Sequence, residues 1–298
     1  MKNGVINIYK ERGFTSHDVV AKLRGILKQK KIGHTGTLDP DAEGVLPVCL
    51  GKGTKLCDML TDHDKVYEAV LLLGQSTDTQ DASGTVLSQA EVTSTEEEVR
   101  EAIMSFVGPY EQIPPMYSAL KVNGQKLCDL ARAGKEVERK ARPVEIYSID
   151  ILEVDLPRVR MSVSCSKGTY IRTLCHDIGE KLGCHGCMEK LLRTKVGQFL
   201  LDGSLTLGQV EQLRDEDRLD ELILPVDQVF VDYPAVYLKE NTSRLGYNGN
   251  PFYRKDTASP EVHAAKVRVY DHVGQFIGIY EYRTERKMYF PLKMFYEK

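Results

Sequence analysis

Apolar residues are spaced as on one face of a helix in three stretches of the chain. The first stretch follows a capping residue, Thr15 or Ser16, and carries Asp18 in its first turn. The second follows the capping box of residues 95–98, and the third covers residues 171–182. Each pattern predicts an amphipathic helix with one buried face. The apolar positions are Val19, Val20, Leu23, Ile26 and Leu27 in the first stretch, Val99, Ile103 and Phe106 in the second, and Ile171, Leu174, Ile178 and Leu182 in the third.

Shorter apolar runs predict strands at residues 5–8, 67–73, 144–154 and 159–165, with Pro157 between the last two. Strands and helices do not alternate as regular βαβ units, so the pattern favours an α+β fold over a doubly wound sheet.

The character of the chain changes between Pro225 and Pro234. Short β-like runs follow at residues 267–270, 276–280 and 288–290, separated by glycine and proline. We therefore expect a large domain over residues 1–228 and a small β-rich domain over residues 229–298.

Composition places few restrictions on function. The chain has 298 residues, of which 42% are hydrophobic and 28% are charged, as in an ordinary globular protein. No apolar run has the length of a membrane span, and the polar start lacks a signal-peptide pattern. The cysteine number is odd, seven, which suits reduced thiols, so we expect a cytoplasmic protein.

The net charge of −3 does not indicate a nucleic-acid binder, but phosphate affinity depends on local patches. Lysines 28, 30 and 31 lie at the predicted C-terminal end of the first helix, where the helix dipole also favours cations. Because they directly precede an unusual loop, we favour phosphate contact there over a merely solvated face. The second basic cluster comprises Lys135, Arg139, Lys140 and Arg142.

That loop, residues 33–46, combines three glycines, hydroxyl side chains, a histidine and three carboxylates. Pro40 restricts Asp39 to an extended backbone, so the carboxylate is held in place. A positioned carboxylate suits a nucleophile or a general base. The alternative is an Asx-turn, in which the side chain only satisfies the loop backbone.

The loop resembles the signature G-H-T-G-T-L-D-P-x-A-x-G-V-L of TruB-type tRNA pseudouridine synthases. The resemblance implies a central mixed, mainly antiparallel sheet flanked by helices, a PUA-like RNA-binding C-terminal domain, and an essential aspartate at Asp39. It also implies isomerisation of uridine-55 in the T-loop of tRNA.

Further motifs extend this resemblance over most of residues 10–199. Tyr67 matches the tyrosine of D-K-x-Y, which in the family stacks on the target uracil; otherwise it is a core residue of a strand. Arg172 matches the arginine of S-x-G-T-Y-I-R-T/S-L, which in the family pairs with the catalytic aspartate. A guanidinium there is expected to lower the pKa of Asp39 and keep it ionised.

The resemblance also assigns substrate contacts. Tyr170 and Leu191 are expected to line and close the pocket, His34 to lie near the displaced nucleotide, and Lys10 to contact substrate. The element Q-x-P-P-x-Y-S-A-x-K matches residues 112–121, and residues 123–134 resemble a mobile RNA-gripping segment. The chain departs from the family pattern at Glu11, Cys128 and Leu192, which leaves the RNA affinity open.

Two other signals are rejected. Cys184-x-x-Cys187 with His176 lacks a second pair at zinc-finger spacing, so we expect no metal. Residues 51–55 lack the spacing of a phosphate-binding loop.

The sequence thus predicts a cofactor-free isomerase that acts on the T-arm and T-loop of tRNA as a monomer, without a membrane or an obligate protein partner. Whether Asp39 attacks the uracil or acts on the ribose stays open. One alternative is a tRNA-binding folding factor in which catalysis is secondary. Another is a subunit of a guide-dependent synthase, a class whose basic extensions are not found here.

Overall fold

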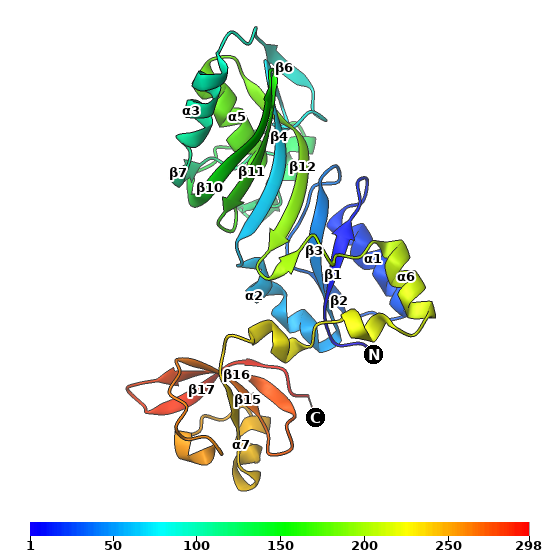
Figure 1. Ribbon diagram of the computed structural model, residues 1–298, viewed down its shortest axis with the longest axis vertical. Helices are drawn as coiled ribbons and strands as arrows, with labels where there is room; N and C mark the ends of the chain where they lie inside the picture. Colours follow the sequence, from blue (N-terminus) through cyan, green and yellow to red (C-terminus); the bar gives the residue numbers. More distant parts are fainter. Residues whose placement is uncertain (298) are drawn as a thin grey trace.

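The computed structural model describes residues 1–297, which form a large α+β body and a smaller β-rich domain (Figure 1). A nine-stranded sheet runs through the body in the order β1-β3-β12-β4-β11-β10-β7, with β13 and β2 attached to β12 and β3. β12 pairs with β3 in parallel, and the other neighbours are antiparallel, as expected. The strands are β1 (Gly4–Lys10), β2 (Ile32–His34), β3 (Glu43–Leu50), β4 (Lys65–Leu73), β7 (Gly108–Gln112), β10 (Arg142–Asp155), β11 (Arg158–Cys165), β12 (Gly186–Val196) and β13 (Phe199–Leu200).

Helices pack on this sheet in two groups, seen at its two ends in Figure 1. One group is α1 (Ser16–Leu27) with α6 (Leu207–Asp215), and the other is α3 (Glu96–Met104) with α5 (Ile171–Leu182). Each group buries its apolar stripe in a separate core, which confirms the three predicted helices. Thr15 and Thr95 each form a capping box with the residue three positions later.

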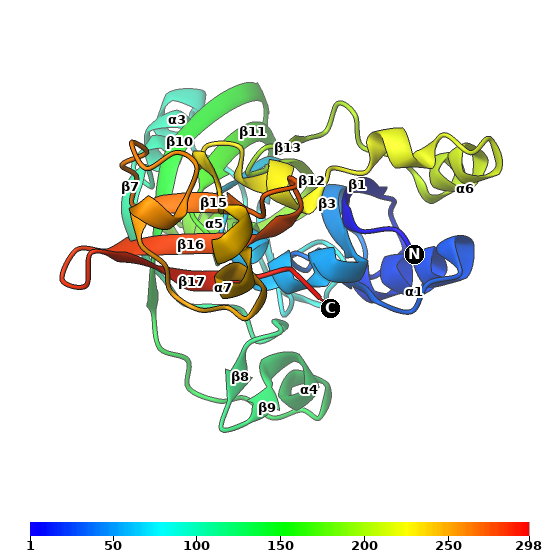
Figure 2. The ribbon, with the colours of Figure 1, turned by 90° about the horizontal axis from the view of Figure 1, so that it is seen from below.

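The remaining elements of the body are short. Two hairpins extend from the sheet, and the second leads directly into α4; Figure 2 shows it standing clear of the sheet. Residues 51–55, rejected as a phosphate loop, lie in a 3-10 helix. These elements are β5 (Gln75–Thr77) with β6 (Val86–Gln89), β8 (Lys121–Val122) with β9 (Gln125–Lys126), α2 (Cys57–Thr61), α4 (Leu127–Arg132), η1 (Gly51–Leu56), η2 (Leu219–Leu222) and η3 (Val226–Phe230).

The C-terminal domain is a four-stranded sheet in the order β14-β15-β16-β17, and its last three strands cover the runs predicted from the sequence. Phe230, Ile279 and Phe295 share an apolar cluster with Val5 and Val45 of the large body, so the two parts meet through a packed interface. The boundary at residue 228 stays a prediction. The elements are β14 (Ala235–Tyr237), β15 (Lys266–Tyr270), β16 (Phe276–Arg283), β17 (Met288–Met294), α7 (Ser243–Tyr247), η4 (Glu240–Thr242) and η5 (Arg254–Asp256).

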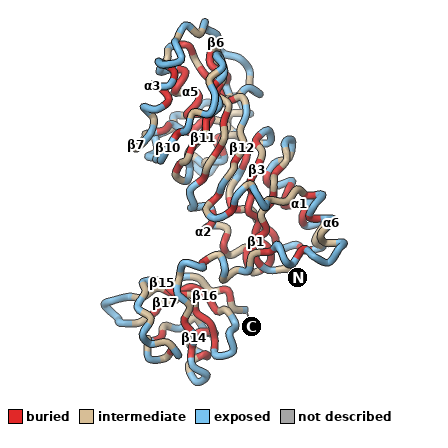
Figure 3. The backbone as a smooth tube through the Cα atoms, viewed as in Figure 1, coloured by how far each residue is buried: buried red, intermediate tan, exposed pale blue. Residues whose placement is uncertain are grey.

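Burial follows the strands and the inner faces of the helices, whereas β6 and the β8–β9 hairpin are largely exposed (Figure 3). Within residues 1–297 no helix has both the length and the apolar character needed to cross a membrane.

Candidate active site

Asp39 lies in the loop between β2 and β3, and the backbone on both sides of it is tied to the segment that leads into α1. The Leu38 N–H donates to Ser16 Oγ at 2.9 Å. The Pro40 carbonyl accepts from the Gly13 N–H at 2.9 Å and from Lys10 Nζ at 3.1 Å. The loop therefore presents the carboxylate from a fixed backbone.

The Asp39 carboxylate meets Arg172, which lies 133 residues later in the first turn of α5. Arg172 Nε is 3.1 Å from Oδ2, and Nη2 is 3.4 Å from Oδ1, so the contact has the geometry of a fork. Since the carboxylate faces the guanidinium, an Asx-turn does not describe Asp39. Arg172 is only 6% exposed, so its guanidinium lies in the interior beside the loop.

Three further acceptors surround the same guanidinium. Arg172 Nη2 donates to the Tyr117 carbonyl at 2.8 Å, and Nη1 donates to the Thr79 carbonyl at 3.2 Å. Nη1 also lies 3.6 Å from Oδ2 of Asp81. Arg172 is thus held between two carboxylates and two carbonyls, which fixes its orientation towards Asp39.

Asp81 was not predicted from the sequence as a site residue. Its other carboxylate oxygen accepts from Thr79 Oγ1 at 2.8 Å and from Ser83 Oγ at 2.5 Å. The loop is bridged to β12 through Met188, whose N–H donates to the Gln80 carbonyl at 3.1 Å. The polar run of residues 77–84 was visible in the sequence, but nothing local indicated that it faces Arg172.

The pKa of Asp39 differs from expectation. Burial raises the pKa of this carboxyl, and the opposing effect of Arg172 does not cancel it. The nearby charge of Asp81 raises the pKa further. Arg172 lowers the pKa of Asp39 as expected, but burial outweighs this effect, and the sequence does not show how far the loop is desolvated. The side chain still keeps 38% exposure, so a ligand can reach it.

Tyr67 lies on β4, is 8% exposed, and belongs to the main core together with Leu38. Burial raises the pKa of its phenol. Its cross-strand partner is Arg193 on β12. In this conformation Tyr67 is a packed core residue next to the Asp39 loop, and a stacking role requires one ring face to be uncovered.

Tyr170 directly precedes α5, and the side chain of Gln112 holds its backbone. Gln112 Oε1 accepts from the Tyr170 N–H at 2.7 Å, and Gln112 Nε2 donates to the Tyr170 carbonyl at 3.0 Å. Gln112 is 1% exposed. This paired contact fixes the start of the helix that carries Arg172, and it gives the Q-x-P-P element a structural role that the sequence did not show.

His34 and Leu191 approach the loop from β2 and β12. The His34 ring packs edge-on against His17 with 5.1 Å between ring centroids, and its Nδ1 accepts from the Gly36 N–H at 3.4 Å. Burial lowers the pKa of His34. Leu191 is half-buried against the core that contains Tyr67.

Lys10 is fully buried and is not available at the surface. Its amine donates to the Phe14 carbonyl at 2.6 Å and to the Glu11 and Pro40 carbonyls at 3.1 Å each. Burial lowers the pKa of Lys10 to about 8. The amine holds the loop after Asp39, and a direct contact with substrate would require it to leave these acceptors.

The first basic cluster is not near Asp39 in space. α1 is 12 residues long, so Lys28 at its C-terminal end lies roughly 18 Å from Ser16, which touches the loop. Lys31 Nζ instead lies 3.5 Å from Glu297 in the C-terminal domain. Proximity in sequence was misleading because the helix carries the chain away before β2 returns it.

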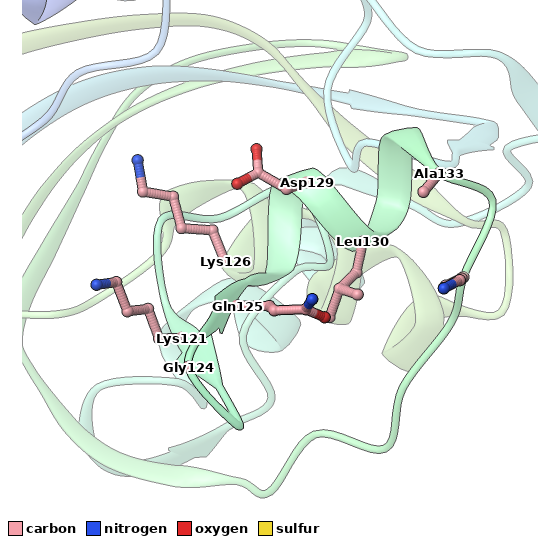
Figure 4. Close-up of a pocket in the computed structure, with 8 residues that line it drawn as sticks. Lys121, Gly124, Gln125, Lys126, Asp129, Leu130 and Ala133 are labelled. Carbon is pink, nitrogen blue, oxygen red and sulfur yellow. The ribbon is translucent and has the colours of Figure 1, made fainter.

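A separate hollow of about 450 Å³ lies at the β8–β9 hairpin and α4, and Asp39 is not part of its lining. Lys121 and Lys126 are cross-strand partners and extend to the same side in Figure 4. The hairpin follows Tyr117, whose carbonyl binds Arg172, so it connects directly to the site.

The seven cysteines are unpaired, and residues 1–297 contain no cluster of three or more His, Cys, Asp or Glu side chains suited to a metal ion. The chemically distinctive group is thus a partly open carboxylate, fixed by a guanidinium, beside two tyrosines. Such an arrangement can supply a nucleophile or a base.

Comparisons with known proteins agree on one family. Residues 24–171 match the N-terminal domain model of the TruB family pseudouridylate synthases, and residues 172–231 match the model of the tRNA pseudouridylate synthase B C-terminal domain. A protein of Lachnoclostridium phytofermentans named tRNA pseudouridine synthase B is 55% identical over 98% of this chain and 99% of its own. One of the same name from Alkaliphilus oremlandii is 50% identical over 84% and 83%. The crystal structure of a Cbf5–Nop10–Gar1 complex matches with a TM-score of 0.74 and 27% identity, covering 98% of this chain and 85% of that chain.

Proposed function

The chain belongs to the TruB family of pseudouridylate synthases, and from this premise we propose that it isomerises uridine-55 in the T-loop of tRNA through the Asp39 carboxylate. In this reaction the N1–C1′ bond breaks, a C5–C1′ bond forms, C5 loses its proton and N1 gains one. The atoms rearrange within one nucleotide, so the reaction needs no oxidant, reductant or group donor.

The observation that carries the proposal is the contact between Asp39 and Arg172, with Nε and Oδ2 3.1 Å apart. Asp39 acts as the nucleophile, or as a base on the ribose, and in either role it must be ionised. Arg172 favours the ionised form and fixes its direction against the effect of burial.

The target uridine must leave the helical stack to reach Asp39. Unstacking costs a few kcal/mol, and stacking on an aromatic ring recovers roughly 1–3 kcal/mol. We assign this stacking to Tyr67, and the lining of the pocket to Tyr170, Leu191 and His34. The tyrosine ring must then be uncovered when RNA binds.

RNA binding is assigned to two regions, the exposed β8–β9 hairpin and the C-terminal domain. We assign contacts with phosphates of the T-arm to Lys121 and Lys126, exposed cross-strand partners on the β8–β9 hairpin. The C-terminal domain offers cation–aromatic pairs, with Arg254 4.0 Å from the Tyr282 ring centroid and Arg283 4.4 Å from that of Phe290. These pairs suit an RNA backbone and unpaired bases. We further propose that the protein acts on its tRNA in the cytoplasm as a monomer.

Site-resolved mapping of pseudouridine in an unmodified tRNA transcript tests this function. We expect pseudouridine at position 55 in proportion to the time of incubation with the purified protein. A transcript with cytidine at position 55 is the control and should gain none. Binding of the transcript without any pseudouridine would refute the proposal and favour a tRNA-binding folding factor, and modification at another uridine would refute the position.

A further inference from the structure

Arg193 is a buried cation that the proposed mechanism leaves without a role. It lies on β12 and is 1% exposed. Its Nε donates to the Val45 carbonyl at 2.7 Å, whereas Nη2 has no hydrogen-bond partner among residues 1–297. A buried guanidinium with a free N–H is costly, so a packing role alone does not account for it.

The position of Arg193 connects the catalytic loop with Tyr67. β12 lies between β3 and β4, and Arg193 on β12 is the register partner of Gly44 on β3 and of Tyr67 on β4. A Cβ at Gly44 would lie 2.2 Å from the Arg193 carbonyl oxygen, and a Cβ at Gly36 would lie 3.9 Å from Nη1. The missing side chain of Gly44 thus allows β12 to approach the start of β3 closely, whereas at Gly36 a Cβ would be in ordinary contact with the guanidinium.

In the described part of the chain, no carboxylate is among the groups that shift the pKa of Arg193, so it is not part of an ordinary ion pair. It lowers the pKa values of Lys10, Lys65 and His34, so its neighbours are themselves basic groups. The side chain that favours its charged form is Tyr67, and Arg193 in turn opposes the rise that burial causes in the pKa of the Tyr67 phenol. Because Tyr67 is the cross-strand partner of Arg193, the two side chains lie on the same face of the sheet, and the phenol oxygen is the acceptor suited to the free Nη2.

We infer that Arg193 is a positioning residue: when RNA binding uncovers the Tyr67 ring, the free Nη2 donates to the Tyr67 hydroxyl oxygen while Nε keeps its bond to the Val45 carbonyl, and this fixes the ring relative to Asp39. This inference rests on the proposed function, in which Tyr67 stacks on the uracil. The link matters most when RNA binding uncovers the ring, because core packing then no longer restrains it from both sides.

A kinetic double-mutant cycle tests the inference. Arg193→Lys keeps a positive charge but loses the planar fork, and Tyr67→Phe keeps the ring but loses the acceptor oxygen. With tRNA at saturation, we expect each single change to slow pseudouridine formation about 10- to 100-fold, because small displacements of a positioned group have effects of this size. Adding Arg193→Lys to Tyr67→Phe should cause less than a further ~3-fold loss, because the shared contact is already absent.

Equal losses from Arg193→Lys in both backgrounds would overturn the inference, because a purely structural role predicts additive effects. A wild-type rate in Tyr67→Phe would overturn it even if the Arg193 variant does not fold. Lys190→Gln, an exposed cation on the same strand, is the matched control and should be unaffected. Absence of pseudouridine with the unaltered protein refutes the proposed function instead, so the two failures are distinguishable.

Discussion

Replacement of Arg172 by lysine separates the geometry of the site from its charge. The guanidinium reaches both oxygens of Asp39 and the carbonyls of Tyr117 and Thr79, with separations from 2.8 to 3.4 Å. A single ammonium group cannot span these acceptors in one position. The lysine variant therefore keeps a cation but loses the fork that orients the carboxylate.

The expected loss follows from the contacts. A hydrogen bond to a charged group contributes about 1.5–3 kcal/mol, and each 1.4 kcal/mol corresponds to a tenfold change in rate. Losing one such bond at Asp39 should slow the reaction roughly 10- to 150-fold. Because Arg172 is only 6% exposed, tRNA affinity should stay within ~3-fold.

The pH dependence of the rate gives an independent test, because the direction in which the acid limb shifts can be predicted. Burial raises the pKa of Asp39, and Arg172 opposes that rise. A weaker guanidinium contact should raise the pKa of Asp39 further. As the pH is lowered, the rate of the lysine variant should therefore begin to fall at a higher pH than the rate of the unaltered enzyme.

The rate and its pH dependence are measured by single-turnover release of tritium from tRNA labelled at C5 of uridine, and the tRNA affinity is measured by filter binding. Arg158→Lys is the matched control, because Arg158 forms a fork with Glu189 on the surface, with Nε 3.1 Å and 3.0 Å from the two oxygens. A rate within twofold of the unaltered enzyme and an unmoved acid limb would refute the reasoning. So would a loss of affinity as large as the loss of rate.

Three further variants test neighbouring contacts. Asp81→Asn removes a charge that raises the pKa of Asp39, so the acid limb of the pH–rate profile should move to lower pH; an upward shift would contradict this. Gln112→Leu removes both hydrogen bonds to the Tyr170 backbone and should lower the free energy of unfolding by ~2–4 kcal/mol in urea titrations. A change under ~0.5 kcal/mol would contradict a stabilising role of this paired contact. Lys10 has a folded pKa of about 8, below its ordinary value, so the unfolded chain holds this proton more tightly and the lysine's contribution to stability should increase as pH rises above 8. The difference in the free energy of unfolding between the unaltered protein and Lys10→Met should therefore grow by at most about 1.4 kcal/mol per pH unit from pH 8 up to pH ~10. A difference that does not change with pH would contradict the burial effect.

Local features of the fold were predictable because they depend on short stretches of sequence. The capping boxes at Thr15 and Thr95 and the stripe of α5 need only neighbours three or four residues apart. The strand runs near both ends of the chain were visible for the same reason. Their order in the sheet, with β12 between β3 and β4, depends on contacts more than 100 residues apart and was not visible.

The pair of Asp39 and Arg172 was predicted through two family motifs and not through periodicity, because Arg172 lies outside the apolar stripe of α5. Asp81 and Gln112 were missed as site residues because each acts on a group far away in sequence. The burial of Lys10 and the raised pKa of Asp39 depend on how tightly the loop packs. No pattern of residue types contains that information.

The central claim is that the Asp39 carboxylate performs the chemistry, and replacing it by asparagine tests this most directly. The amide keeps the size of the side chain and removes its charge, so tRNA should bind within ~3-fold of the unaltered affinity. Forming the new C5–C1′ bond displaces the hydrogen at C5, so tritium release from C5-labelled tRNA reports the reaction itself. We predict that the Asp39→Asn variant, with bound tRNA at saturation, releases no tritium above background. Tritium release at a rate near that of the unaltered enzyme would contradict the account.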